Sequence, residues 1–163
     1  MSADYEGTVE QVHQAFRDEQ YWLSRLADSG ADDATLDSLT VAPDSAISVS
    51  TTQVLRADRL PGVVTQFHRG DLRIQRREQW TPVTDGRSSA TVTGVIANAP
   101  VTLEGTATLG PRGTGGARLD SRAKVEVRIP LVGGKIESFV GAQLVDLLIA
   151  EQRFTSLWIT ENA

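Results

Sequence analysis

Two charged residues fall on a face of a predicted strand that is otherwise apolar. The even positions of residues 72–80 form that face: Leu72, Ile74, Arg76, Glu78 and Trp80. Side chains two residues apart share one face of a strand, so Arg76 and Glu78 point inward if the apolar members do. A charge in a dry core costs several kcal/mol unless it is paired. The pair therefore has three candidate roles: a semi-buried brace or rim, a polar anchor for a ligand head group, or, at Glu78, a catalytic acid.

Other side chains that could do chemistry are few. On a predicted strand at 47–55, Thr51 and Gln53 share a face with apolar residues. His13 lies on the apolar side of a predicted helix, which is typical of a core or interface residue with one satisfied ring nitrogen. For His68, in a predicted loop, solvation is one interpretation and general acid–base work at a pocket mouth is the other. Two histidines and no cysteine exclude a multi-histidine or thiolate metal site, so we expect no metal.

The segment PLVGGKIESFVGA at 130–142 pairs two glycines with a lysine. A phosphate-binding loop needs G-x-x-x-x-G-K-[ST]. Here Ile136 replaces the hydroxyl residue, and Ile129 stands where the first glycine should be, five residues before Gly134. We therefore expect no nucleotide and no other cofactor. The segment instead predicts a sharp reversal, in which Pro130 ends a strand and the glycines let a helix fold back over the sheet.

Length and composition suit a single domain over 1–163, because 40% hydrophobic content can build a core. The lack of cysteine favours a reducing cytoplasm. No uncharged apolar run reaches the roughly 18 residues that span a bilayer, so we expect no stable membrane insertion. The net charge of −5 disfavours nucleic acid as a partner. The arginines within 69–77 are interpreted as a solvated strand face.

Period-two alternation between turn signals predicts an antiparallel meander in the middle of the chain. The expected strands are 34–42, 46–55, 71–83, 88–97, 101–110 and 117–129. In the last of these, odd positions are mainly apolar and even positions are charged, so one face is buried and the other is wet. Residues 56–70 interrupt the meander and are expected to hold one helical turn under a longer loop.

Helical periodicity marks both ends of the chain. Residues 8–17 and 19–28 predict two short helices, the first with Thr8 and Gln11 as a capping box. The second helix is expected to bury Tyr21 or Trp22, Leu23 and Leu26. A broad apolar stripe predicts a long C-terminal helix over 132–160, with Glu151 mostly off the stripe. The stripe comprises Ile136, Phe139, Val140, Leu144, Leu147, Leu148, Phe154, Leu157 and Trp158.

This arrangement resembles the α+β helix-grip fold of the START-like (SRPBCC) superfamily, a curved antiparallel sheet with the C-terminal helix across its concave face. Three segments are similar to the family called domain of unknown function 2505: VEQVHQAFRDEQYWLSRLA at 9–27, LRIQRREQWTP at 72–82 and IPLVGGKIESFVGAQL at 129–144. The resemblance covers nearly the whole chain. It implies a ligand cavity, since superfamily relatives bind lipids, sterols or polyketides and some catalyse cyclisation. It transfers no catalytic residue.

The residues themselves also favour open volume between sheet and helix. Aromatic content is only 6%, and small residues such as Gly94, Gly105 and Ala107 stand at inward positions. We therefore predict a cavity for a small hydrophobic ligand. Its expected lining is Gln53, Phe67, His68, Arg76, Glu78, Trp80, Ile136, Phe139, Val140, Gln143 and Leu147.

The main functional hypothesis is a non-catalytic carrier or sensor of a lipid, sterol or polyketide-like ligand, acting as a monomer or homodimer. The residues expected to orient the ligand are Gln53, His68, Arg76 and Glu78. One alternative is an enzyme of the aromatase/cyclase type that uses Glu78 or His68 for proton transfer. Another is a ligand-free module for a protein partner, its cavity filled by Trp80, Phe139 and Phe154.

Overall fold

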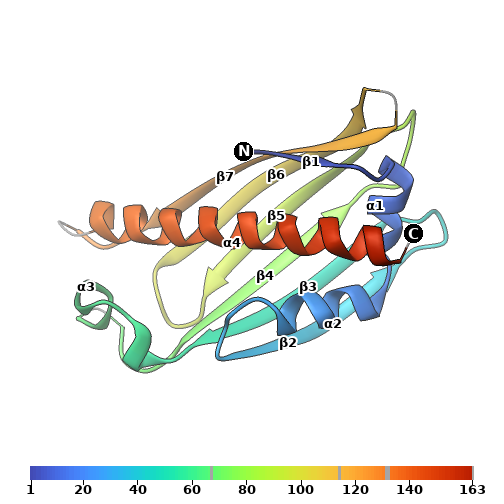
Figure 1. Cartoon of the computed structure of the whole chain (residues 1–163). Coiled ribbons are helices and arrows are strands. Elements are labelled where there is room, and N and C mark those ends of the chain that lie inside the picture. Colours follow the sequence, from blue (N-terminus) through green and yellow to red (C-terminus); the bar gives the residue numbers. More distant parts are fainter. Residues whose placement is uncertain (67, 114, 131–132, 163) are drawn as a thin grey trace.

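A single antiparallel sheet of seven strands dominates the computed structural model, which describes residues 1–66, 68–113, 115–130 and 133–162 (Figure 1). The strands lie in the order β1-β7-β6-β5-β4-β3-β2, so every neighbouring pair except β1 and β7 is also consecutive in sequence. The bounds are β1 (Ser2–Tyr5), β2 (Asp33–Val41), β3 (Ile47–Leu55), β4 (Leu72–Trp80), β5 (Ser88–Ile96), β6 (Val101–Arg112) and β7 (Gly116–Val127).

Helices cover one face of this sheet, and the predicted α+β helix-grip architecture is confirmed (Figure 1). The long C-terminal helix α4 runs across the sheet, and α1 and α2 lie towards its C-terminal end. Their bounds are α1 (Val9–Phe16), α2 (Glu19–Ala27) and α4 (Gly133–Glu161). The interruption between β3 and β4 holds the expected single helical turn, α3 (Gly62–Thr65), preceded by a 3₁₀ turn, η1 (Ala57–Arg59).

Two strand predictions need correction. The N-terminal strand β1 was not expected, because four residues are too short for a clear alternation; it pairs with β7 from Ser2 opposite Asp120 to Tyr5 opposite Ala117. The strand expected at 71–83 ends at Trp80. Pro82 offers no N–H to a sheet ladder, which explains why the strand stops before it.

The first two helices follow their capping signals. The Thr8 hydroxyl accepts from the Gln11 amide at 3.2 Å, and the Gln11 side chain accepts from the Thr8 amide at 2.8 Å, so the predicted capping box is confirmed. In α2, both Tyr21 and Trp22 are buried. The expectation for Leu23 was wrong, because the side chain is exposed and the helix turns Arg25 inward instead.

Apolar side chains form two separate clusters beneath α4. The first, the aromatic cluster, comprises Tyr5, Phe16, Tyr21, Trp22, Trp80, Phe154 and Trp158 with smaller neighbours. The second, the aliphatic cluster, comprises Val64, Leu72, Ile96, Val101, Val127 and Ile136. Among its described residues, α4 is fully buried only at Gly133, Ile136, Thr155 and Ile159, near its two ends. Leu157, expected on the apolar stripe, is 62% exposed.

The chain reverses between β7 and α4 as predicted, but β7 ends at Val127, three residues before Pro130, so Pro130 does not end the strand. A Cβ atom on Gly133 would lie 2.8 Å from the carbonyl oxygen of Val127, whereas a Cβ on Gly134 would meet nothing within 4 Å. The Glu137 carboxylate accepts from the Val127 amide at 3.0 Å. The first turn of α4 is therefore fastened to the end of β7, which sets where the helix crosses the sheet.

Candidate ligand-binding site

The inward orientation predicted for Arg76 and Glu78 is observed. Along β4 the even positions are buried or half-buried and the odd positions are exposed. The Arg76 side chain is 8% exposed and the Glu78 side chain 12%. On the neighbouring strand β3, Thr51 and Gln53 are buried as expected. The inner face of the sheet therefore carries several polar groups at its centre.

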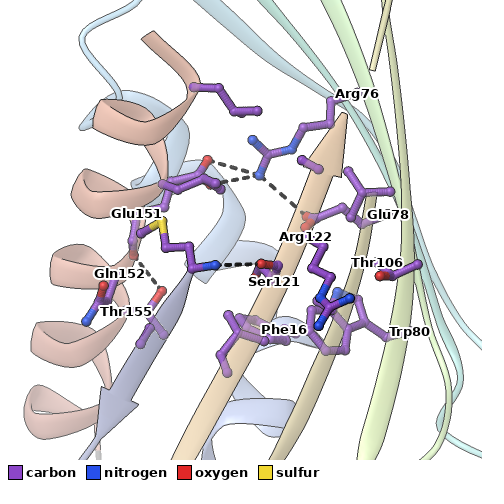
Figure 2. Close-up of a pocket in the computed structure, with 18 of the residues that line it drawn as sticks. Phe16, Arg76, Glu78, Trp80, Thr106, Ser121, Arg122, Glu151, Gln152 and Thr155 are labelled. Atoms are coloured by element: carbon purple, nitrogen blue, oxygen red, sulfur yellow. Dashed lines mark hydrogen bonds and ion pairs between the residues drawn. The ribbon is translucent and has the colours of Figure 1, made fainter. Parts of the chain in front are cut away.

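Four charged side chains from three elements form a buried cluster, which we call the charge cluster: Arg25, Arg76, Glu78 and Glu151. Nη2 of Arg76 donates to both carboxylate oxygens of Glu151, at 2.9 and 3.0 Å. Nη2 of Arg25 lies 2.7 Å from Oε2 of Glu151. Glu78 contacts Arg76 only at 3.8 Å. Figure 2 shows Arg76 between the two carboxylates, so the sequence-based pair exists but its stronger partner is on α4.

The electrostatics of the cluster follow from this geometry. Burial alone would raise the pKa of Glu151, but the attraction of Arg25 and Arg76 outweighs burial and lowers that pKa to about 2. For Arg25 and Arg76, burial acts against the charged form, yet the attraction of Glu151 prevails and raises both pKa values. All three groups are therefore ionised across the physiological pH range.

Sequence reasoning missed Arg25 and Glu151. The signal for Glu151 was its position, because Leu144, Leu148, Glu151 and Thr155 follow i, i+4, i+7, i+11 spacing on one side of α4. Its charge led to its assignment to the outer face. Arg25 lies four residues after Tyr21 and three after Trp22, and its guanidinium stacks 4.6 Å from the Trp22 ring centre.

A cavity of about 360 Å³, which we call the larger cavity, lies between the sheet and α4. It is on the side of Arg76 that faces the aliphatic cluster. Its floor comprises Gln53, Leu55, Ile74, Arg76, Gly94, Ile96, Val101, Leu103 and Val125, with Val95 also in contact. Its roof is formed by Val140, Gln143, Leu144, Asp146, Leu147 and Ala150 of α4. Among the lining residues, Gly30, Arg59, Val95, Gln143 and Asp146 are exposed.

A smaller cavity of about 90 Å³ adjoins it on the aromatic side (Figure 2). Both cavities are bordered by Arg76, Leu103 and Leu144. The smaller one also contacts Phe16, Glu78, Trp80, Glu151 and Thr155. The Trp80 side chain is buried, and its Nε1 finds no acceptor among the described residues. Arg76 thus stands where the two cavities meet, and the other three members of the charge cluster border the smaller cavity.

The structure brings together most of the predicted lining residues. Gln53, Arg76, Val140, Gln143 and Leu147 border the larger cavity. Glu78 and Trp80 border the smaller one. Ile136 and Phe139 pack in the aliphatic cluster and border neither cavity, so their contact with a ligand stays a prediction. Phe67 lies outside the described residues.

The two histidines occupy separate structural positions. His13 is buried, and its Nε2 lies 3.0 Å from the Thr81 carbonyl oxygen, which confirms the core interpretation. Burial lowers the pKa of His13. His68 follows α3, where its Nε2 lies 3.3 Å from the Ala97 carbonyl oxygen. It borders neither cavity, so Glu78 and His68 do not share one.

The fold is the α+β helix-grip fold that START-like proteins have. The chain belongs to the family described as "Protein of unknown function (DUF2505)", whose model matches residues 1–159. It is 51% identical, over 99% of its length and 96% of the relative's, to the uncharacterized protein Rv0481c of Mycobacterium tuberculosis.

Solved structures with this fold are distant in sequence. The crystal structure of TTHA0849 from Thermus thermophilus has a TM-score of 0.66 at 14% identity and covers 100% of this chain and 97% of that one. A STAR-related lipid transfer protein from Xanthomonas axonopodis has a TM-score of 0.56 at 14% identity, with coverage of 94% and 82%. No helix among the described residues is long and apolar enough to cross a bilayer.

Proposed function

We propose that this chain is a carrier or sensor that binds a small hydrophobic ligand, of lipid, sterol or polyketide type, in the larger cavity. The observation that carries the proposal is the apolar hollow beneath the middle of α4. Ile74 and Leu103 on the floor and Leu147 on the roof are only half-buried, although they lie between the sheet and the helix. A folded chain gains nothing from leaving such surface in contact with water.

A ligand would supply the missing contacts. Each Å² of apolar surface that it removes from water contributes roughly 25 cal/mol. A volume of about 360 Å³ lies within the usual range of small-molecule pockets, about 300–1,000 Å³. Three of the exposed lining side chains, Arg59, Gln143 and Asp146, are polar and suit an entrance that stays hydrated.

Three further observations fit this proposal. A solved structure with the same fold is named as a lipid transfer protein, although the likeness extends to the fold alone. The cysteine-free composition fits a reducing cytoplasm, where we expect the protein to act. The aromatic residues that could have filled the larger cavity do not border it, since Trp80 and Phe154 join the aromatic cluster and Phe139 joins the aliphatic one.

Native mass spectrometry of the freshly purified protein, followed by extraction and identification of bound compounds, tests this function. We expect a complex of one chain with one hydrophobic small molecule. A chain recovered without any compound is then titrated with N-phenyl-1-naphthylamine, a neutral hydrophobic fluorophore, and saturable binding is expected. Failure of both measurements contradicts the proposed function.

A further inference from the structure

Polar groups without partners gather around the smaller cavity. Nε1 of Trp80 is a buried donor without an acceptor among the described residues. Arg76 uses only Nη2 in its contacts with Glu151 and Glu78, so its Nε and Nη1 donate to no described residue. The Glu78 carboxylate accepts no hydrogen bond from the described part of the chain and meets Arg76 only at 3.8 Å. Of these atoms only Nε1 of Trp80 is fully enclosed, and a buried donor is normally satisfied. The Arg76 and Glu78 side chains keep 8% and 12% exposure, so their free donors and acceptors can take an oxygen-bearing group.

The charge balance of the site indicates what kind of group that is. The two guanidiniums of Arg25 and Arg76 offset the two carboxylates of Glu78 and Glu151, so the charge cluster is neutral as a whole. An added carboxylate or ammonium group would leave one buried charge uncompensated, at a substantial desolvation cost. Arg122 and the α-amino group of Met1 also border the smaller cavity, but both residues are exposed, and water screens their charges.

We infer that the smaller cavity binds the uncharged, oxygen-bearing end of an amphipathic ligand, such as a hydroxyl or carbonyl group, while its apolar body fills the larger cavity. The inference rests on the proposed function and adds the polarity of the ligand to it. Arg76 and Trp80 donate to the ligand oxygen, and Glu78 accepts from a hydroxyl. Arg76 acts as a specificity-determining residue at the junction of the two cavities.

Displacement of bound N-phenyl-1-naphthylamine by 1-decanol and by decanoate at pH 8 tests the inference. Decanol is more hydrophobic than decanoate and would bind more tightly to any apolar pocket. The readout is therefore the ratio of the two affinities and the change of that ratio on substitution. In Glu78→Gln the charge cluster gains a net positive charge. We expect the ratio to shift towards decanoate by at least about tenfold. Glu104→Gln, the same change on an exposed side chain of β6, should leave the ratio unchanged.

Trp80→Phe is a second variant, which removes the Nε1 donor and replaces the indole by a smaller phenyl ring. It should weaken decanol binding by roughly three- to tenfold. Decanoate binding to the wild-type protein as tightly as decanol, or an unchanged ratio in Glu78→Gln, would overturn the inference while the proposed function stands. Absence of fluorophore binding to the wild-type protein would instead overturn the proposed function, and the inference with it.

Discussion

Replacing Glu151 by glutamine tests whether the charge cluster holds α4 to the sheet. The substitution keeps the size of the side chain and removes its charge. It leaves the guanidiniums of Arg25 and Arg76 buried, with Glu78 at 3.8 Å as the remaining counter-charge. Removing one partner of a buried ion pair costs about 3–5 kcal/mol. For a chain of this length, that corresponds to a fall in Tm of roughly 6–20 °C.

The pKa of Glu151 gives an independent magnitude. Its value of about 2 in the folded chain, against a usual 4.5, corresponds to about 3 kcal/mol of stability. Because the folded pKa is depressed, this contribution is fully present above pH 5. It is lost as the pH falls from about 5 to 2, since the unfolded chain takes up the proton first. The difference between wild type and Glu151→Gln should therefore shrink on acidification, to about half or less at pH 3.

Urea unfolding followed by tryptophan fluorescence measures the stability loss and its dependence on pH, since Trp22 and Trp80 are buried. The free energy of unfolding is compared for wild type and Glu151→Gln at pH 7 and pH 3. Glu104→Gln is the control for loss of an exposed carboxylate. A difference of less than about 1 kcal/mol at pH 7, or one that does not shrink at pH 3, would refute the reasoning.

Two further substitutions test the packing of α4. Gly133→Ala should lower the free energy of unfolding by about 1–3 kcal/mol, because the new Cβ would lie 2.8 Å from the Val127 carbonyl oxygen. Gly134→Ala is the control and should be neutral or slightly stabilising, since its Cβ meets nothing within 4 Å. Equal effects of the two substitutions in urea unfolding would contradict the close approach at Gly133. Tyr21→Phe removes the hydroxyl that lies 2.6 Å from Thr155 Oγ1 and accepts from Arg25 at 3.3 Å. It should cost about 1–2 kcal/mol in the same assay, and a wild-type midpoint would show that this buried network contributes nothing.

The inward and outward faces of the strands could be predicted from sequence, because apolar and polar residues alternate with the same two-residue period as the side chains on a strand. On β4 and β7 this placed inward and outward residues correctly, Arg76 and Glu78 included. The partners of those charges could not be predicted in the same way. Arg25 and Glu151 lie 51 residues before and 75 residues after Arg76, and only the fold brings them together.

Glu151 also shows how residue type can mislead. Its helical position is inward, but a carboxylate is normally assigned to the solvated face, and only its two arginines make burial tolerable. The cavities also could not be predicted in detail from the sequence, because their volume depends on how the side chains of distant residues pack between the sheet and α4. Gly94 was an inward candidate from sequence, yet only coordinates show that it shares one cavity floor with Leu103.

Blocking the larger cavity with one side chain tests the central claim most directly. Leu147 is half-buried on the roof, whereas Val145, two residues earlier on α4, is 49% exposed and borders neither cavity. The measurement is the Kd for N-phenyl-1-naphthylamine in Leu147→Trp and Val145→Trp, both checked for folding by circular dichroism. We predict that Leu147→Trp weakens binding by at least about tenfold and that Val145→Trp matches wild type. Equal affinities in the two variants would contradict a ligand site between the sheet and α4.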